Sequence, residues 1–200
     1  MGKSRIVGRT RSRAQALQII FQAEAAGRSV EDVLNDTYML SDGPLDAFGR
    51  QLAEGCGSQI PELDVIIQRY SRNWSLNRIS SVDKNLLRLA LYEILNEDTI
   101  DIPISIDECV ELAKAFGTDD SSRFVNGILG SVASALESGE DLLGQAKVEV
   151  AAKCAVGEKA KTTETEQACG CDSDDSDMAC GCSDDVCGCK DAESEVESGE

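Results

Sequence analysis

The segment 82–95 constrains the fold more than any other part of this 200-residue chain. Its apolar side chains recur at helical spacing and cover most of a helix circumference: Leu86, Leu87, Leu89, Ala90, Leu91, Ile94 and Leu95. A helix that is apolar on most of its sides must be covered from several directions. Ser81 is a suitable N-cap, and Asp83 in the first turn suits the positive end of the helix dipole. The sequence therefore predicts that this segment is the central helix of an all-α domain.

Other segments show the same helical period of apolar residues. The predicted helices cover residues 10–26, a short stretch from 29, residues 45–56, residues 62–70, a helix from 103 that stops at Gly117, and a last helix capped by Thr118 or Asp119. With the central helix, this gives about seven helices, an ordinary density for residues 1–140.

The sequence also predicts how the last two helices are capped and packed. Ser105 and Glu108 fit a capping box, which places the predicted N-cap at Ser105. The predicted buried face of that helix consists of Ile106, Cys109, Val110, Ala113 and Phe116. In the last helix, we expect Gly127 and Gly130 to permit the close approach of a neighbouring element.

Charge divides the chain into two parts. Residues 141–200 hold 16 acidic and 5 basic side chains, and they show no continuing apolar period. Such a segment is usually solvated and disordered. We therefore predict a helical domain over residues 1–140, followed by an acidic, cysteine-rich, low-complexity tail over residues 141–200.

The composition excludes several classes of protein. The chain has no histidine, which rules out histidine-based acid–base catalysis and mixed Cys/His metal sites. No apolar run is long enough to span a bilayer, and no hydrophobic segment follows the basic N-terminus as in a signal peptide. No phosphate-binding loop, nucleophile elbow or pair of catalytic carboxylates stands out. We therefore predict a cytoplasmic protein that is not an enzyme and needs no cofactor.

Basic side chains cluster at the N-terminus, where the first thirteen residues contain five Lys and Arg and no acid. The cluster consists of Lys3, Arg5, Arg9, Arg11 and Arg13. Clustered basic charge is the pattern expected of nucleic-acid binding, because guanidinium groups pair with phosphates and stack on bases. The alternative is a disordered tip that keeps the chain soluble.

The nine cysteines fall into two groups. Cys56 and Cys109 lie on apolar helix faces and are predicted to be core residues, while Cys154 is uninformative. The tail repeats the tripeptide Cys-Gly-Cys three times, with the cysteines at Cys169, Cys171, Cys180, Cys182, Cys187 and Cys189. Thiolates at this spacing could hold Zn²⁺ or Cu(I), although structural zinc sites more often have two residues between cysteines. The alternative is a reduced, unstructured tail.

Four segments resemble the NusB family of transcription antitermination factors. They are ALQIIFQAE at 16–24, VDKNLLRLALYEIL at 82–95, IDECVELAKAFG at 106–117 and RFVNGIL at 123–129. The resemblance implies two small helical bundles and a partner, the ribosomal protein NusE. It also implies that the pair binds boxA-type single-stranded RNA in nascent transcripts, notably those of ribosomal RNA, and helps RNA polymerase resist termination.

The resemblance also nominates an RNA surface, built from the basic N-terminal segment and the start of the last helix. The matching positions are Arg9, Arg11, Arg13, Asp120, Arg123 and Phe124. Phe124 could stack on an unpaired base, or it could be an ordinary core residue. Asp120 could simply cap the last helix. The alternative function is a thiol-rich metal-binding or redox-sensing protein that uses the helical domain as a carrier.

Overall fold

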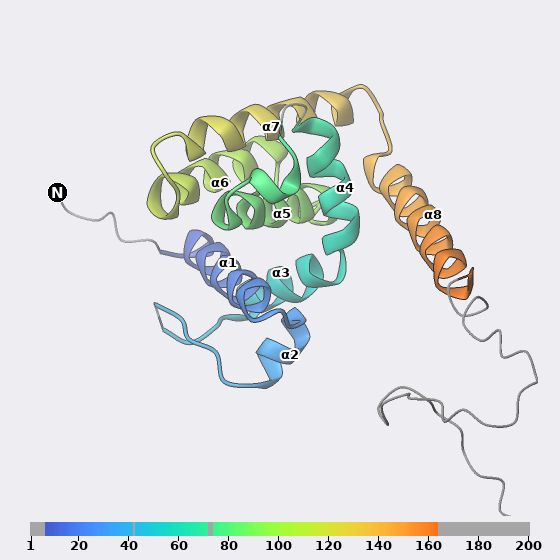
Figure 1. Ribbon diagram of the computed structural model, residues 1–200. Helices are drawn as coiled ribbons and strands as arrows, with labels where there is room; N and C mark the ends of the chain where they lie inside the picture. The colour runs from blue at the N-terminus through green and yellow to red at the C-terminus, as the bar shows by residue number, and fades with distance from the viewer. Residues whose placement is uncertain (1–6, 42, 72–73, 164–200) are drawn as a thin grey trace, which may run out of the picture. The chain divides into compact units, whose positions relative to one another are not determined.

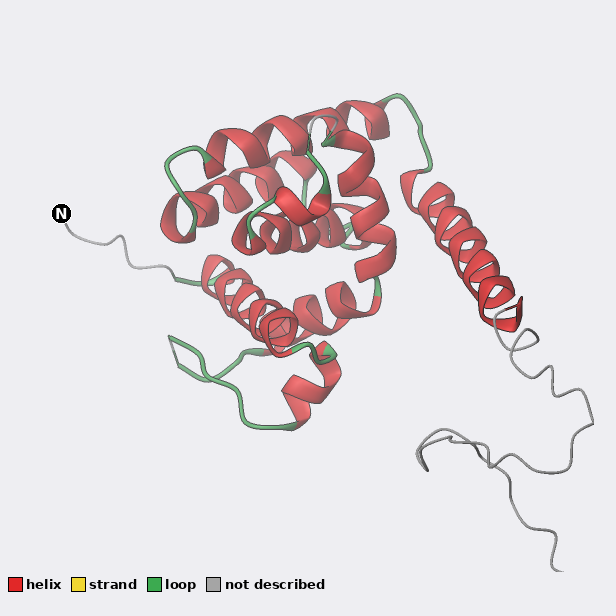
Figure 2. Ribbon diagram, viewed as in Figure 1, coloured by secondary structure: helices red, strands yellow, loops and turns green. Residues whose placement is uncertain are grey.

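The structure is a computed structural model that describes residues 7–41, 43–71 and 74–163, and all its regular elements there are helices (Figures 1 and 2). The elements are α1 (Arg9–Ala26), α2 (Val30–Asn35), α3 (Ala47–Ser58), α4 (Ile60–Tyr70), the short 3₁₀ helix η1 (Leu76–Arg78), α5 (Ser81–Asn96), α6 (Ile102–Phe116), α7 (Ser121–Glu137) and α8 (Leu142–Thr163). The all-α prediction is confirmed.

Helix α5 is the centre of the fold, as its sequence predicts. Helices α1, α2 and α3 pack together as one bundle, and α4, α6 and α7 form a second around α5 (Figure 1). Helix α5 contacts α1 and α3 as well as α4, α6 and α7. Its buried side chains include Leu86, Leu87 and Leu91, which are fully inaccessible. The apolar circumference of α5 therefore joins the two bundles through one core.

Several predicted helix starts are wrong by one to four residues. Ser80 rather than Ser81 caps α5, because its Oγ accepts a hydrogen bond from the Asp83 N–H at 3.1 Å. Helix α6 begins at Ile102, one turn before the predicted cap, with Pro103 in its first turn, where a missing N–H costs nothing. Ser105 is therefore an interior residue of α6, and its side chain is buried. Asp120 holds the N-cap position of α7.

Two predictions about packing are also wrong. Phe116, expected on the buried face of α6, is 39% exposed because it ends the helix at the edge of the core. A Cβ added to Gly127 or Gly130 would meet no atom within 4 Å, so no described neighbouring element packs closely against either glycine. The close approach occurs at Gly49 instead, where an added Cβ would lie 2.9 Å from the Ser12 carbonyl oxygen. Gly49 thus lets α3 lie directly against α1.

A network of charged side chains ties α1 and α4 to α5. The Arg88 guanidinium donates two hydrogen bonds of 2.7 Å to Asp64 and one of 2.8 Å to Asn85 Oδ1. Glu24 pairs with Lys84 and accepts a hydrogen bond of 2.6 Å from the Asn85 amide. Burial alone would raise the pKa of Glu24, but these donors and the Arg88 charge outweigh it and hold that pKa below 4.5. Glu24 is therefore stabilised in its charged form by folding.

We expect Glu24→Gln to reduce the stability of the protein at neutral pH by on the order of 1 kcal/mol. A carboxylate whose pKa is lowered by folding contributes stability above its unfolded pKa and loses it as the pH falls through its folded pKa. The difference between the variant and the unsubstituted protein should therefore shrink as the pH falls below about 4.5. Urea denaturation at pH 7, 5 and 3.5 measures it, and a difference independent of pH would contradict the expectation.

Helical structure continues beyond the boundary predicted at residue 140. Helix α8 starts at Leu142, and its first turn is closed by Asp141, whose Oδ1 accepts the Gly144 N–H at 2.9 Å. Leu142 and Ala146, one turn apart, are buried in the core. Arg69 of α4 donates to Gln145 Oε1 at 2.6 Å. A buried stripe that is only one residue wide per turn gives a weak apolar period, which is why the sequence pattern does not reveal α8.

Candidate RNA interface

The start of α1 presents two of the predicted arginines to solvent. The Arg9 guanidinium lies 5.2 Å from the centroid of the Phe48 ring, a cation–π contact that holds it against α3. The Arg11 side chain is 38% exposed and lies 3.8 Å from Asp46 Oδ2, a long and weak ion pair. No acidic residue lies in the first turn of α1. The positive end of the helix dipole and two guanidinium groups therefore act together and favour an anion.

Arg13 lies in the interior, unlike its two neighbours. Its side chain is 6% exposed, and its Nε and Nη2 bond both oxygens of Glu93 at 2.8 and 2.9 Å. Its Nη1 donates to Glu108 at 3.2 Å. Glu93 also accepts a hydrogen bond of 2.5 Å from Ser105. The Arg13 guanidinium is turned inward and ties α1 to α5 and α6. Arg13 therefore does not belong to the exposed surface formed by Arg9 and Arg11, which is called the arginine surface below.

The predicted residues of α7 lie at its first turn. Asp120 is exposed, and within the described residues its side chain makes no capping hydrogen bond. Ser121 instead accepts the Thr118 N–H at 2.9 Å. Arg123 is exposed and has no ion-pair partner in the part of the chain that the structure describes. Among the described residues, the start of α7 thus offers the cation of Arg123 and the carboxylate of Asp120, neither of them in an ion pair.

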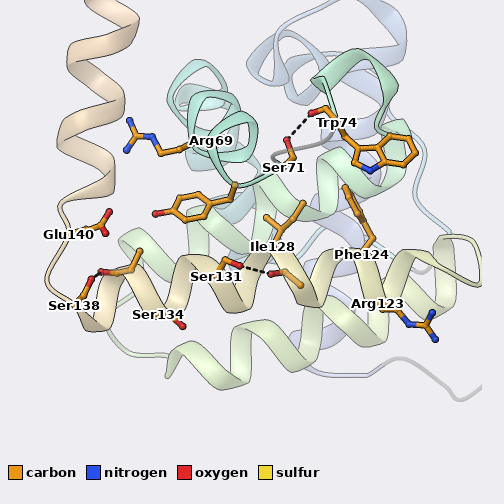
Figure 3. Close-up of a pocket in the computed structure, with 13 residues that line it drawn as sticks. Arg69, Ser71, Trp74, Arg123, Phe124, Ile128, Ser131, Ser134, Ser138 and Glu140 are labelled. Atoms are coloured by element: carbon orange, nitrogen blue, oxygen red, sulfur yellow. Dashed lines mark hydrogen bonds between the residues drawn. The ribbon is translucent and has the colours of Figure 1, made fainter.

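Phe124 is neither a fully buried core residue nor a fully open platform. It is partly buried and packs against the core. Its ring meets the Trp74 ring edge-on, with centroids 6.5 Å apart and planes at 70°. In Figure 3 these two rings lie together at one end of a groove, while the Arg123 side chain extends away from it.

This groove runs along α7 and has a volume of about 940 Å³. On α7 its lining includes the small residues Gly127, Ser131 and Ser134, together with the larger Phe124 and Ile128. Arg69 and Glu140 lie at the end opposite the two aromatic rings (Figure 3). Gly127 and Gly130, expected to admit a neighbouring helix, thus leave open surface on α7.

The sequence prediction missed Trp74 and Arg78 as surface residues. Neither residue is among the RNA contacts predicted from the sequence. The structure leaves Trp74 47% exposed, with the Arg78 guanidinium 5.2 Å from its ring centroid. One sequence feature could have pointed to these two residues. The chain has one tryptophan, and it lies four residues before an arginine in a segment without helical period.

The metal-binding prediction lies outside the described residues, because all six cysteines of the three Cys-Gly-Cys repeats follow residue 163. Within the described residues, no group of three or more cysteine and acidic side chains could hold a metal ion. Cys56 and Cys109 are buried, as predicted. Burial raises the pKa of the Cys56 thiol to about 12 and also raises that of Cys109, so both stay protonated. In the same part of the chain, no helix has the length and apolar character that crossing a membrane requires.

Comparisons with known proteins identify the family and the fold of this chain. The chain is 45% identical over 126 residues to the transcription antitermination protein NusB of Desulforudis audaxviator, which covers 62% of this chain and 91% of that protein. A solved structure of T. maritima NusB is 38% identical, with a TM-score of 0.57, and covers 65% of this chain and 93% of that one. A structure titled as antitermination factors NusB and NusE in complex with dsRNA shares the fold, with 23% identity, a TM-score of 0.51 and coverage of 64% and 96%. The NusB family model matches residues 10–134, and this chain therefore belongs to the NusB family.

Proposed function

We propose that this protein is a transcription antitermination factor that binds boxA-type RNA of nascent transcripts together with the ribosomal protein NusE. The observation that carries the proposal is family membership over most of the helical domain, with 45% identity to a NusB antitermination protein. A solved structure of antitermination factors NusB and NusE in complex with dsRNA supports the choice of NusE and of an RNA as partners. Acting on nascent transcripts places the protein in the cytoplasm, in a complex with RNA polymerase.

The arginine surface supports RNA binding despite the chain's net charge of −18. Arg9 and Arg11 lie at the positive end of α1, and Arg123 lies at the positive end of α7. These guanidinium groups can pair with phosphates, while Trp74 and Phe124 offer ring surface to unstacked bases. Phosphate pairing and base stacking are binding interactions, and we propose a binding function without catalysis.

The test is binding by the full chain, with and without the NusE protein of the same organism. We expect fluorescence anisotropy to show that the two proteins together bind a short boxA-type RNA at least about tenfold more tightly than a scrambled RNA of equal length. Salt must be held constant, because phosphate contacts make affinity depend on it. Equal binding of the two RNAs would leave only non-specific attraction and refute the proposal.

A further inference from the structure

Three arginines at helix starts form no strong ion pair within the described residues. Arg9 and Arg123 have no ion-pair partner there, and Arg11 has only the long contact of 3.8 Å with Asp46. The Nε of Arg11 is also buried without a hydrogen-bond partner in that part of the chain. All three lie in a first helical turn that contains no acidic residue, where the helix dipole adds positive potential. These guanidinium groups are therefore available to an anionic ligand.

The acidic charge of the chain is concentrated in residues 164–200, which are called the acidic segment below. This segment lies outside the described residues and outside residues 10–134, which the family model matches. It holds 13 acidic side chains and one lysine, so it carries −12 of the net charge of −18. Six aspartates fall within fourteen residues that include no basic side chain: Asp172, Asp174, Asp175, Asp177, Asp184 and Asp185. The chain therefore carries a polyanion of its own.

The acidic segment is long enough to meet these arginines. Its 37 residues can extend to about 120 Å, whereas a compact domain of about 150 residues has a radius of gyration of about 15 Å. Covalent attachment also gives the segment a high effective concentration, which can reach the millimolar range for a linked ligand. Weak pairing between exposed groups is then sufficient for partial occupancy of the arginines.

We propose that the acidic segment binds the guanidinium groups of Arg9, Arg11 and Arg123 and competes there with RNA. Its aspartates take the place of RNA phosphates, because a carboxylate accepts the same kind of charge-assisted hydrogen bond from a guanidinium group. An RNA strand that also stacks its bases on Trp74 and Phe124 displaces the segment. The proposal rests on the proposed function in one respect, the choice of RNA as the competitor.

The first experiment tests the contact in the full chain, without RNA and without NusE. A nitroxide is attached to Cys180, which lies between the aspartates in the sequence, after the other cysteines beyond residue 153 are replaced by serine. Cys56 and Cys109 stay unlabelled, because both thiols are buried. At low salt, amide NMR signals from the first turns of α1 and α7 should be broadened more than those of α2, which follows the opposite end of α1. High salt should restore them, because it screens exposed pairs.

The control keeps the nitroxide and changes the six aspartates of residues 172–185 to asparagine. These substitutions lie outside the described core, and the signals from the first turns of α1 and α7 should stay sharp at low salt. Equal broadening with aspartate and with asparagine would show a contact that does not depend on carboxylates. Sharp signals in the aspartate chain would show that the segment does not bind the arginines. Either result overturns the proposal.

The second experiment measures the competition with RNA in the full chain. The six-asparagine variant should bind a short boxA-type RNA about three- to tenfold more tightly at low salt and less than about twofold more tightly at high salt. When Arg9, Arg11 and Arg123 are all alanine, the same six substitutions should change RNA affinity by less than about twofold. Equal tightening in both backgrounds would reflect general repulsion between the acidic segment and RNA, and it would overturn the proposal.

The outcomes separate this proposal from the proposed function. A chain that binds no RNA, with or without NusE, refutes the proposed function, while the nitroxide experiment still decides whether the acidic segment binds the arginines. Normal boxA binding with sharp signals at low salt refutes the acidic-segment contact alone. Sharp signals together with weaker NusE binding by the six-asparagine variant would also overturn it and would assign the acidic segment to the partner protein.

Discussion

Replacing Arg13 by alanine should destabilise the folded domain by about 3–5 kcal/mol. The substitution removes three hydrogen bonds and leaves Glu93 buried, with Ser105 as its one remaining hydrogen-bond donor among the described residues. Breaking a buried ion pair from one side costs more than the pair contributes, because the remaining charge stays desolvated. Urea denaturation followed by far-UV circular dichroism measures the change in the free energy of unfolding.

Arg11→Ala is the matched control, two residues away on the same helix. Its guanidinium is partly exposed and only 3.8 Å from Asp46, so its removal should cost less than about 1 kcal/mol. Arg13→Ala should weaken RNA binding only under conditions in which a fraction of the variant molecules is unfolded. A folded and fully stable Arg13→Ala protein that no longer binds RNA would show that this guanidinium turns outward to the RNA.

Replacing both Arg9 and Arg123 by alanine should lower RNA affinity strongly at low salt and reduce its salt dependence. Neither guanidinium has an ion-pair partner in the described residues, so each can meet a phosphate without breaking an internal ion pair. Removing one phosphate contact should lower the magnitude of the log–log salt slope by about 0.7 for single-stranded RNA. Removing two should lower it by about 1.4, which anisotropy titrations over a series of salt concentrations measure.

The control for that variant is a double substitution that removes the same net charge elsewhere. Arg28 and Arg50 are exposed arginines already paired with Asp36 and Glu54. Arg28→Ala with Arg50→Ala should leave the salt slope unchanged. If both double variants reduce the slope equally, the RNA responds to total charge, and Arg9 and Arg123 do not form a local surface.

The position of Arg13 shows where sequence reasoning about the site ended. Arg13 lies four residues before Leu17 and three before Ala16, both buried, so it shares the inward face of α1. The sequence alone therefore indicates that Arg13 lies on the same face of the helix as these buried residues. The carboxylate that makes its burial tolerable belongs to Glu93, eighty residues later, and no local pattern connects the two.

The same reason explains why Asp83 was assigned only a helix-dipole role. Its position in the first turn of α5 is apparent from the sequence, but its burial depends on η1 and the start of α7 packing over it. The exposed face of α7 at Gly127 and Gly130 has a similar origin, because glycine permits a close contact and tertiary packing decides whether one forms.

The sequence by itself determined the all-helical fold and the central position of α5, because apolar spacing along one chain segment fixes which helix faces must be buried. The resemblance of four segments to known sequences determined the family. It also located the arginines and Phe124 as candidate RNA contacts. Only the tertiary structure decided which of them face solvent, since that depends on the rotation of each helix against neighbours distant in the chain. Helix rotation placed Arg9 and Arg123 at the surface, turned Arg13 toward Glu93, and enclosed Asp83 Oδ1 without a hydrogen-bond partner among the described residues.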